Sequence, residues 1–105
     1  MTFCPWYPLA QAPSHAPSGP GVLQLRVRDG LIDYPRGKSA MIYYAVADDL
    51  RQAAVELGPR FAATPVLCRH TDVLLDTERA DLRAAFARLL HSFEARFGAM
   101  PGLPT

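Results

Sequence analysis

The sequence has 105 residues and a formal net charge of +1 at pH 7; half of its residues are hydrophobic and a fifth are charged. This length leaves room for one hydrophobic core, and the balanced composition excludes a chain that is disordered throughout. No apolar run reaches the roughly 18 residues that span a bilayer, and the first residues lack the basic start of a signal peptide. We therefore expect a cytoplasmic protein with no membrane partner.

Residues 1–18 are rich in proline and in aromatic side chains. Each proline removes a backbone donor and clashes with the preceding helical turn, so at most a short turn of helix fits near residues 8–12. Phe3, Trp6 and Tyr7 carry large apolar areas. We expect this segment to pack on the rest of the chain or on a second copy, and a homodimer through it is one predicted assembly.

Residues 19–105 show the pattern of an α+β domain. Apolar and polar residues alternate over residues 21–28, which predicts a half-buried strand, and residues 41–46 and 64–69 predict two more. Residues 31–40 contain Pro and Gly and predict an irregular connection or a wide hairpin arm. Asp48 or Asp49 is expected to cap a helix over residues 50–57, and Asp76 or Thr77 a long helix over residues 78–97. The predicted fold is a small three-stranded, mostly antiparallel sheet packed with helices.

Three short motifs accompany these elements. Pro20-Gly21-Val22-Leu23 opens the first strand, Tyr43-Tyr44-Ala45 lies in the second, and Asp49-Leu50-Arg51 begins the first helix. In their types and order they resemble the motifs of the GIY-YIG nuclease superfamily. The resemblance covers residues 19–105 and implies a GIY-YIG-like fold related to metal-dependent nucleases.

The same resemblance implies that catalysis is lost. Members of the family hydrolyse phosphodiesters with two tyrosines, an arginine and a glutamate that holds a divalent cation. Here Leu23 replaces the first tyrosine, Tyr43 keeps the second, Ala53 replaces the arginine, and Phe86 stands at or near the glutamate. The resemblance therefore implies no catalytic residue beyond a remnant Tyr43, no metal ligand and no cofactor.

Basic and aromatic residues near the predicted strands suggest weak nucleic-acid binding. Arginine and lysine neutralise phosphates, whereas tyrosine stacks on bases or donates hydrogen bonds. The alternatives are purely structural roles: the basic residues would lie on a solvated face of the sheet, and the tyrosine would pack in the core. The candidate residues are Arg26, Arg28, Arg36, Lys38, Tyr43 and Arg51.

Cys68 and His70 fall on the same face of the third predicted strand, and with Asp72 and His91 they suggest a metal site or a nucleophilic pair. Zinc sites use closely spaced pairs of Cys or His, and only one such pair exists here. Together with the distant Cys4, Cys68 is therefore expected to be a free thiol.

Three functions remain open from the sequence. The first is a non-catalytic module that binds nucleic acid weakly or within a larger assembly. The second is a structural or protein-interaction domain that forms homodimers and has no nucleic-acid role. The third is a divergent metal-dependent endonuclease.

Overall fold

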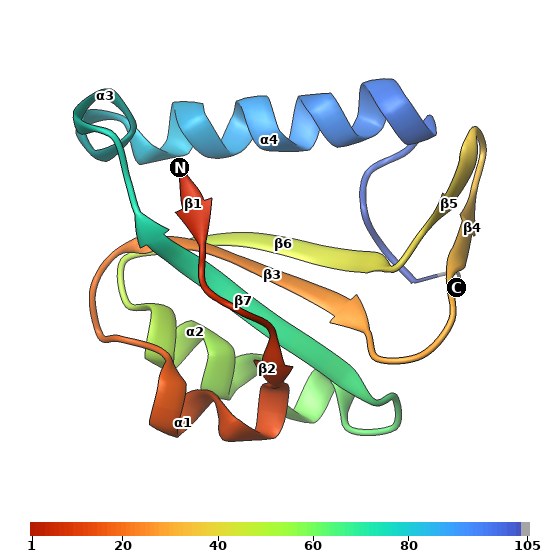
Figure 1. The fold of residues 1–105 in the computed structure, drawn as a ribbon, viewed down its shortest axis with the longest axis horizontal. Coiled ribbons are helices and arrows are strands. Elements are labelled where there is room, and N and C mark those ends of the chain that lie inside the picture. Colours follow the sequence, from red (N-terminus) through yellow and green to blue (C-terminus); the bar gives the residue numbers. More distant parts are fainter. Residues whose placement is uncertain (104–105) are drawn as a thin grey trace.

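Three long strands form the centre of the structure, a computed structural model that describes residues 1–103. They are β3 (Gly21–Val27), β6 (Met41–Ala47) and β7 (Val66–Val73). β3 lies between the other two, and all of the strand pairs are antiparallel. The predicted α+β class and antiparallel sheet are confirmed (Figure 1).

The N-terminal segment adds two short strands to this sheet. β1 (Thr2–Phe3) and β2 (Tyr7–Pro8) both pair with β7, so the main sheet has five strands. The prediction of a three-stranded sheet is therefore wrong. Strands of two residues carry no alternation that a sequence pattern can reveal, and their pairing depends on a partner strand far away in the chain.

Helices cover both faces of the sheet (Figure 1). On one face lie η1 (Leu9–Gln11), α1 (Ala12–His15), α2 (Leu50–Leu57) and η2 (Pro59–Phe61). The carboxylate of Asp49 caps α2 by accepting a hydrogen bond from the Gln52 backbone N–H at 3.0 Å. On the other face lies α4 (Leu82–Phe97), which follows the short α3 (Asp76–Ala80).

The single helix predicted over residues 78–97 is interrupted at Asp81. This residue has a non-helical backbone with φ −142°, and its carboxylate accepts a hydrogen bond from the Ala84 N–H at 3.1 Å. Aspartate side chains compete with helical hydrogen bonds in this way, so Asp81 ends one helix and caps the next. Gly98, with φ +84°, ends α4 in the left-handed conformation that favours glycine.

Residues 31–40, expected to form an irregular connection or a wide hairpin arm, contain a small hairpin. β4 (Ile32–Tyr34) pairs with β5 (Gly37–Ser39) and lies apart from the main sheet. Its turn meets the end of α4, where Arg36 donates from its backbone to Phe97 and from Nη2 to Ala95. Tyr34 packs edge-on against Phe93 of α4 at 5.1 Å between ring centroids.

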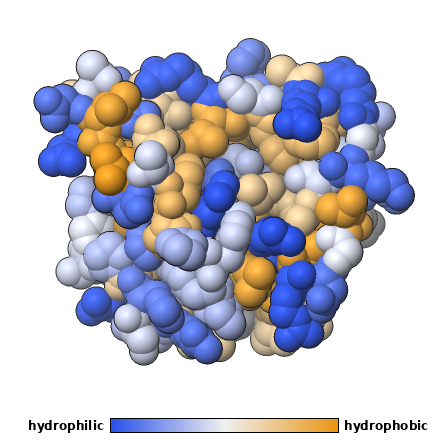
Figure 2. All heavy atoms as spheres, in the orientation of Figure 1, coloured by the Kyte–Doolittle hydropathy of each residue, from blue (hydrophilic) through white to orange (hydrophobic). Residues whose placement is uncertain are grey.

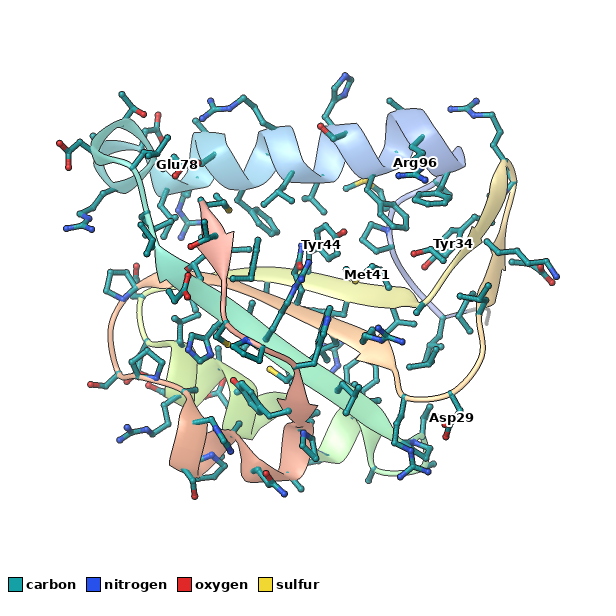
Figure 3. All side chains as sticks on the ribbon, in the orientation of Figure 1. Asp29, Tyr34, Met41, Tyr44, Glu78 and Arg96 are labelled. Carbon is teal, nitrogen blue, oxygen red and sulfur yellow. The ribbon has the colours of Figure 1, made fainter. Side chains whose placement is uncertain are left out.

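The two faces of the sheet have different chemistry. The face toward α1 and α2 holds an apolar core that includes Leu23, Leu25, Leu50 and Cys68, all at most 1% exposed. The face toward α4 carries polar and aromatic side chains; Tyr44 and Tyr34 point into the space beneath this helix (Figure 3). Within residues 1–103, no helix is long and apolar enough to cross a membrane.

Candidate functional site

Tyr43, the tyrosine that the GIY-YIG resemblance predicts to be kept, lies on the face covered by α2. It pairs with Leu25 across the sheet and lines a pocket of about 260 Å³ together with Ala53, Glu56 and Arg60. Arg60 Nη1 donates to the Tyr43 hydroxyl at 3.4 Å, and its guanidinium carbon lies 5.0 Å from the ring centroid. Tyr43 and Ala53, which the resemblance matches to the second tyrosine and the helix arginine, therefore share one pocket.

Two other positions of the motif lie elsewhere. Leu23 is completely buried in the core and does not line this pocket. Phe86 lies half-buried on α4, on the other side of the sheet. Among residues 1–103, no group of three or more His, Cys, Asp or Glu side chains could hold a metal ion.

Four of the predicted nucleic-acid contacts have partners within the chain. Arg28, which lies just beyond the end of β3, pairs with its neighbour Asp29 at 3.0 Å, and Lys38 lies 3.5 Å from Asp33. Arg36 donates to carbonyls at the end of α4. Arg51 donates from Nε to the Ala16 carbonyl at 2.8 Å, just beyond α1.

The sixth candidate, Arg26, belongs to a different group of side chains, which we call the arginine–aromatic cluster: Phe3, Trp6, Arg26 and Arg69. The guanidinium carbon of Arg69 lies 4.6 Å from the Phe3 ring centroid and 4.4 Å from that of Trp6. The guanidinium carbon of Arg26 lies 5.5 Å from the Trp6 ring. All four side chains are half-buried.

The strand register explains how the cluster forms. Gln24 of β3 lies directly opposite Arg69 of β7, and Arg26 follows Gln24 by two residues, so alternation places all three side chains on the face toward α4. The N-terminal segment pairs with β7 and brings Phe3 and Trp6 beside Arg69. In Figure 2, hydrophilic atoms lie among hydrophobic ones at the centre of the face below α4.

The two guanidinium groups of the cluster have no carboxylate partner within residues 1–103. Arg69 Nε donates to the buried Gln24 Oε1 at 2.7 Å, and Arg26 Nε donates to the Val27 carbonyl at 3.2 Å. Burial lowers the pKa of Arg69, and the charge of Arg26 acts in the same direction. Arginine nevertheless stays protonated in proteins, so two positive charges lie side by side without a counter-charge.

The terminal nitrogens of these arginines remain open to a ligand. Neither Nη atom of Arg26 or Arg69 donates to another group in the described part of the chain. No buried side-chain nitrogen or oxygen in that part lacks a hydrogen-bond partner, so these Nη atoms must contact solvent. Held in place by Gln24 and by the rings, they present fixed donors to an anion.

Sequence reasoning missed most of this cluster. Arg69 was placed at the end of the third predicted strand, but β7 continues to Val73. Alternation within Cys68-Arg69-His70 does separate Arg69 from the thiol face, which is a usable signal. Nothing in the sequence shows that Phe3 and Trp6 pack on β7, because that contact joins segments far apart in the chain.

Cys68 and His70 also lie where the alternation placed them, on the face toward α1. Asp72 accepts a hydrogen bond from the hydroxyl of Thr2, and His91 lies on α4.

Comparisons with models of known protein families, with curated proteins and with solved structures found no match for this chain. The resemblance to the GIY-YIG superfamily therefore stays a prediction.

Proposed function

We propose that this chain is a non-catalytic nucleic-acid-binding module, a GIY-YIG-like domain in which the arginine–aromatic cluster binds the ligand. The observation that carries this proposal is the position of Arg69, whose guanidinium group lies against the Phe3 and Trp6 rings near Arg26 with no carboxylate partner in residues 1–103. Of the sequence-predicted contacts, Arg26 belongs to this surface.

The chemistry of the cluster suits a single strand with exposed bases. Guanidinium groups donate to phosphate oxygens in a fixed geometry, and here stacking on the rings limits the rotamers of Arg69. Half-exposed aromatic side chains offer surfaces on which unpaired bases stack, with about 1–3 kcal/mol per base. A net charge of only +1 predicts binding that is weak and sensitive to salt.

The fate of the family's catalytic positions supports a non-catalytic role. Leu23 has no hydroxyl and is fully buried, and Ala53 brings no charge to the pocket of Tyr43. The carboxylate expected near Phe86 is missing from that part of α4, where Arg83 and Arg88 are the charged neighbours. Each loss removes a different part of metal-assisted phosphodiester hydrolysis.

The single tryptophan of the chain gives a direct test, because Trp6 lies in the cluster. Its fluorescence is recorded while single-stranded, duplex and branched DNA are added at about 50 mM salt. We expect quenching that is strongest with the single strand. In Arg69→Gln, affinity should fall roughly 10-fold to 100-fold, which corresponds to a charged hydrogen bond of about 1.5–3 kcal/mol.

Arg83→Gln is the matched control, since Arg83 is exposed on α4 and the change in net charge is the same. We expect it to bind nearly as tightly as the original chain. The proposal fails if none of the three DNA forms binds at about 50 mM salt. It also fails if Arg83→Gln weakens binding as much as Arg69→Gln does, because binding would then follow overall charge.

One observation favours a divergent endonuclease as the second candidate. Tyr43, Glu56 and Arg60 line the same pocket, so a tyrosine, a glutamate and an arginine meet there although two of them come from positions outside the family motif. Cleavage of DNA that requires magnesium or manganese and disappears in Tyr43→Phe would establish this function in place of the first.

A further inference from the structure

One edge of the main sheet is left open by the fold. β1 and β2 of the N-terminal segment pair with β7 and cover that edge, whereas β6 pairs with β3 alone (Figure 1). Residues 43–47 of β6 pair with residues 21–25 of β3 without interruption. β6 is therefore an edge strand, and its side away from β3 is available for pairing with another strand.

The register of the sheet identifies the backbone groups on that open side. The Val27 N–H donates to the carbonyl just before β6 at 2.9 Å, so the odd-numbered residues of β3 direct their backbone groups toward β6. Leu23 is one of them, and Ala45 lies opposite it with its own backbone toward β3. By alternation, Tyr44 and Val46 direct their N–H and C=O groups to the open side, and these groups have no hydrogen-bond partner within residues 1–103.

The open side of β6 lacks the protection that is usual for an edge strand. Natural edges carry charges, prolines, bulges or a covering loop, which prevent pairing with another chain. The strand MIYYAVA has neither a charge nor a proline. Its one irregularity in register lies near Met41, outside residues 43–47. We therefore expect this stretch to be paired in the assembled protein.

The helix α4 adds apolar surface along the same edge. Ser92 lines a pocket together with Met1, so this side of α4 faces β1, and the buried Phe93 faces the sheet. Each residue turns an α-helix by about 100°. Phe86 and Leu90 therefore lie further around the helix from Ser92 than Phe93 does, on the side away from Met1. Both are half-buried, and they border the open edge of β6.

We propose that β6 pairs with β6 of a second copy of this chain about a two-fold axis at Ala45, which joins the two main sheets into one antiparallel sheet. In this register Tyr44 lies opposite Val46 of the second copy, and all of their free N–H and C=O groups are paired. An aromatic and a β-branched side chain form a favourable cross-strand pair, and the axis repeats it. The arginine–aromatic cluster lies toward β7 and takes no part.

A second copy fits the charges at this edge. A two-fold axis places each residue on it beside its own equivalent, so a charge there would meet a like charge. The axis falls on an uncharged strand, and Asp48, the nearest charge along the chain, would lie opposite Ile42 of the second copy. Glu56 and Arg60 line the pocket beside Ala45, and neither forms an ion pair within residues 1–103. Each copy thus offers both signs of charge to the other.

Light scattering after size-exclusion chromatography of the full chain tests the proposal. We expect the mass to approach twice 11.5 kDa as the concentration rises. Val46→Pro removes an outward N–H and none of the bonds to β3, so it should keep the far-UV circular dichroism of the original chain. Its dimer dissociation constant should rise at least about tenfold, since the lost bond recurs by symmetry. Val46→Thr is the matched control; it keeps the N–H and the β-branched shape and should stay dimeric.

Ala45→Lys and Ala45→Glu test the position of the axis and do not depend on the folding of Val46→Pro. Each variant alone places like charges opposite one another, so we expect monomers. An equimolar mixture should restore the dimer, because opposite charges then face each other. A mass of 11.5 kDa for the original chain at every concentration overturns the proposal. A dimer that survives in Val46→Pro, or in either Ala45 variant alone, also overturns it and places the interface on another surface, such as the N-terminal segment.

Discussion

The ten arginines of this chain differ in what their guanidinium groups contact. Arg36 and Arg51 donate to carbonyls at the ends of helices, and Arg28 pairs with an adjacent carboxylate. The guanidinium group of Arg69 lies close to the Phe3 and Trp6 rings and has no carboxylate partner within residues 1–103. Residue type and spacing alone cannot separate these roles, because the partner in each case depends on the tertiary structure.

His70 links the stability of the fold to pH. Burial lowers its pKa below the ordinary value of 6.5; the charge of Asp72 opposes this shift, and that of His15 adds to it. The unfolded chain therefore binds the proton first as the pH falls. The stability that neutral His70 contributes is fully present above about pH 6.5 and is lost as the pH falls through that value toward the folded pKa.

Urea unfolding between pH 8 and pH 5 measures this effect. We expect the free energy of unfolding of the original chain to fall over this range more steeply than that of His70→Asn, which has no imidazole to protonate. The difference between the two proteins should shrink as the pH decreases. Parallel pH profiles would show that His70 has the same proton affinity in the folded and unfolded chains.

At the scale of elements, the sequence predicted those that carry a periodic pattern. The alternation of Leu23, Leu25 and Val27 located β3, and the bounds expected for α2 agree with the structure. The elements that it missed, β1 and β2, are short and depend on a distant partner strand, and for the β4–β5 hairpin it left an irregular connection open as the alternative. Asp81 shows the limit of the prediction at a helix start, since the apolar stripe begins only at Leu82 and residues 76–80 form a separate short helix.

The cap of α2 provides a test at this scale. The Asp49 carboxylate accepts a hydrogen bond from the Gln52 N–H. The carboxylate of the adjacent Asp48 is exposed and accepts no hydrogen bond within residues 1–103. Asp49→Ala should lower the free energy of unfolding by about 1 kcal/mol, within a range of roughly 0.5–2 kcal/mol. Asp48→Ala makes the same change in charge and should have almost no effect in urea unfolding. An equal loss in both variants would mean that charge, and not the cap, matters.

The candidate site was predictable in part. The motif resemblance pointed to Tyr43 and Ala53, and these two do line one pocket. The arginine–aromatic cluster was beyond prediction because Trp6 and Arg69 meet only when the N-terminal segment pairs with β7. The contact between Cys4 and His70 was hidden for the same reason, since it also forms only when the N-terminal segment pairs with β7.

For the whole molecule, the N-terminal segment is part of the fold. Tyr7, Leu9, Ala12 and Ala16 are all buried, and three of them belong to the same core cluster as Leu25 and Cys68. Both faces of the main sheet depend on this segment: Phe3 and Trp6 contribute to the α4 side, and Tyr7 and Leu9 to the α1 side. A homodimer through these residues would have to use the surface that remains outside.

Removal of residues 1–18 should therefore unfold the domain. Fully burying a side chain such as Leu9 contributes about 1.5–3 kcal/mol, and the truncation also removes Tyr7, two alanines and two strands from the sheet. This loss is comparable to the roughly 5–15 kcal/mol that stabilises a typical domain. Circular dichroism of residues 19–105 should show no cooperative thermal transition, whereas the full chain with Trp6→Ala should keep one because Trp6 is only half-buried. A truncated chain that melts like the full chain would make residues 19–105 an independent domain and free the N-terminal aromatics for a partner.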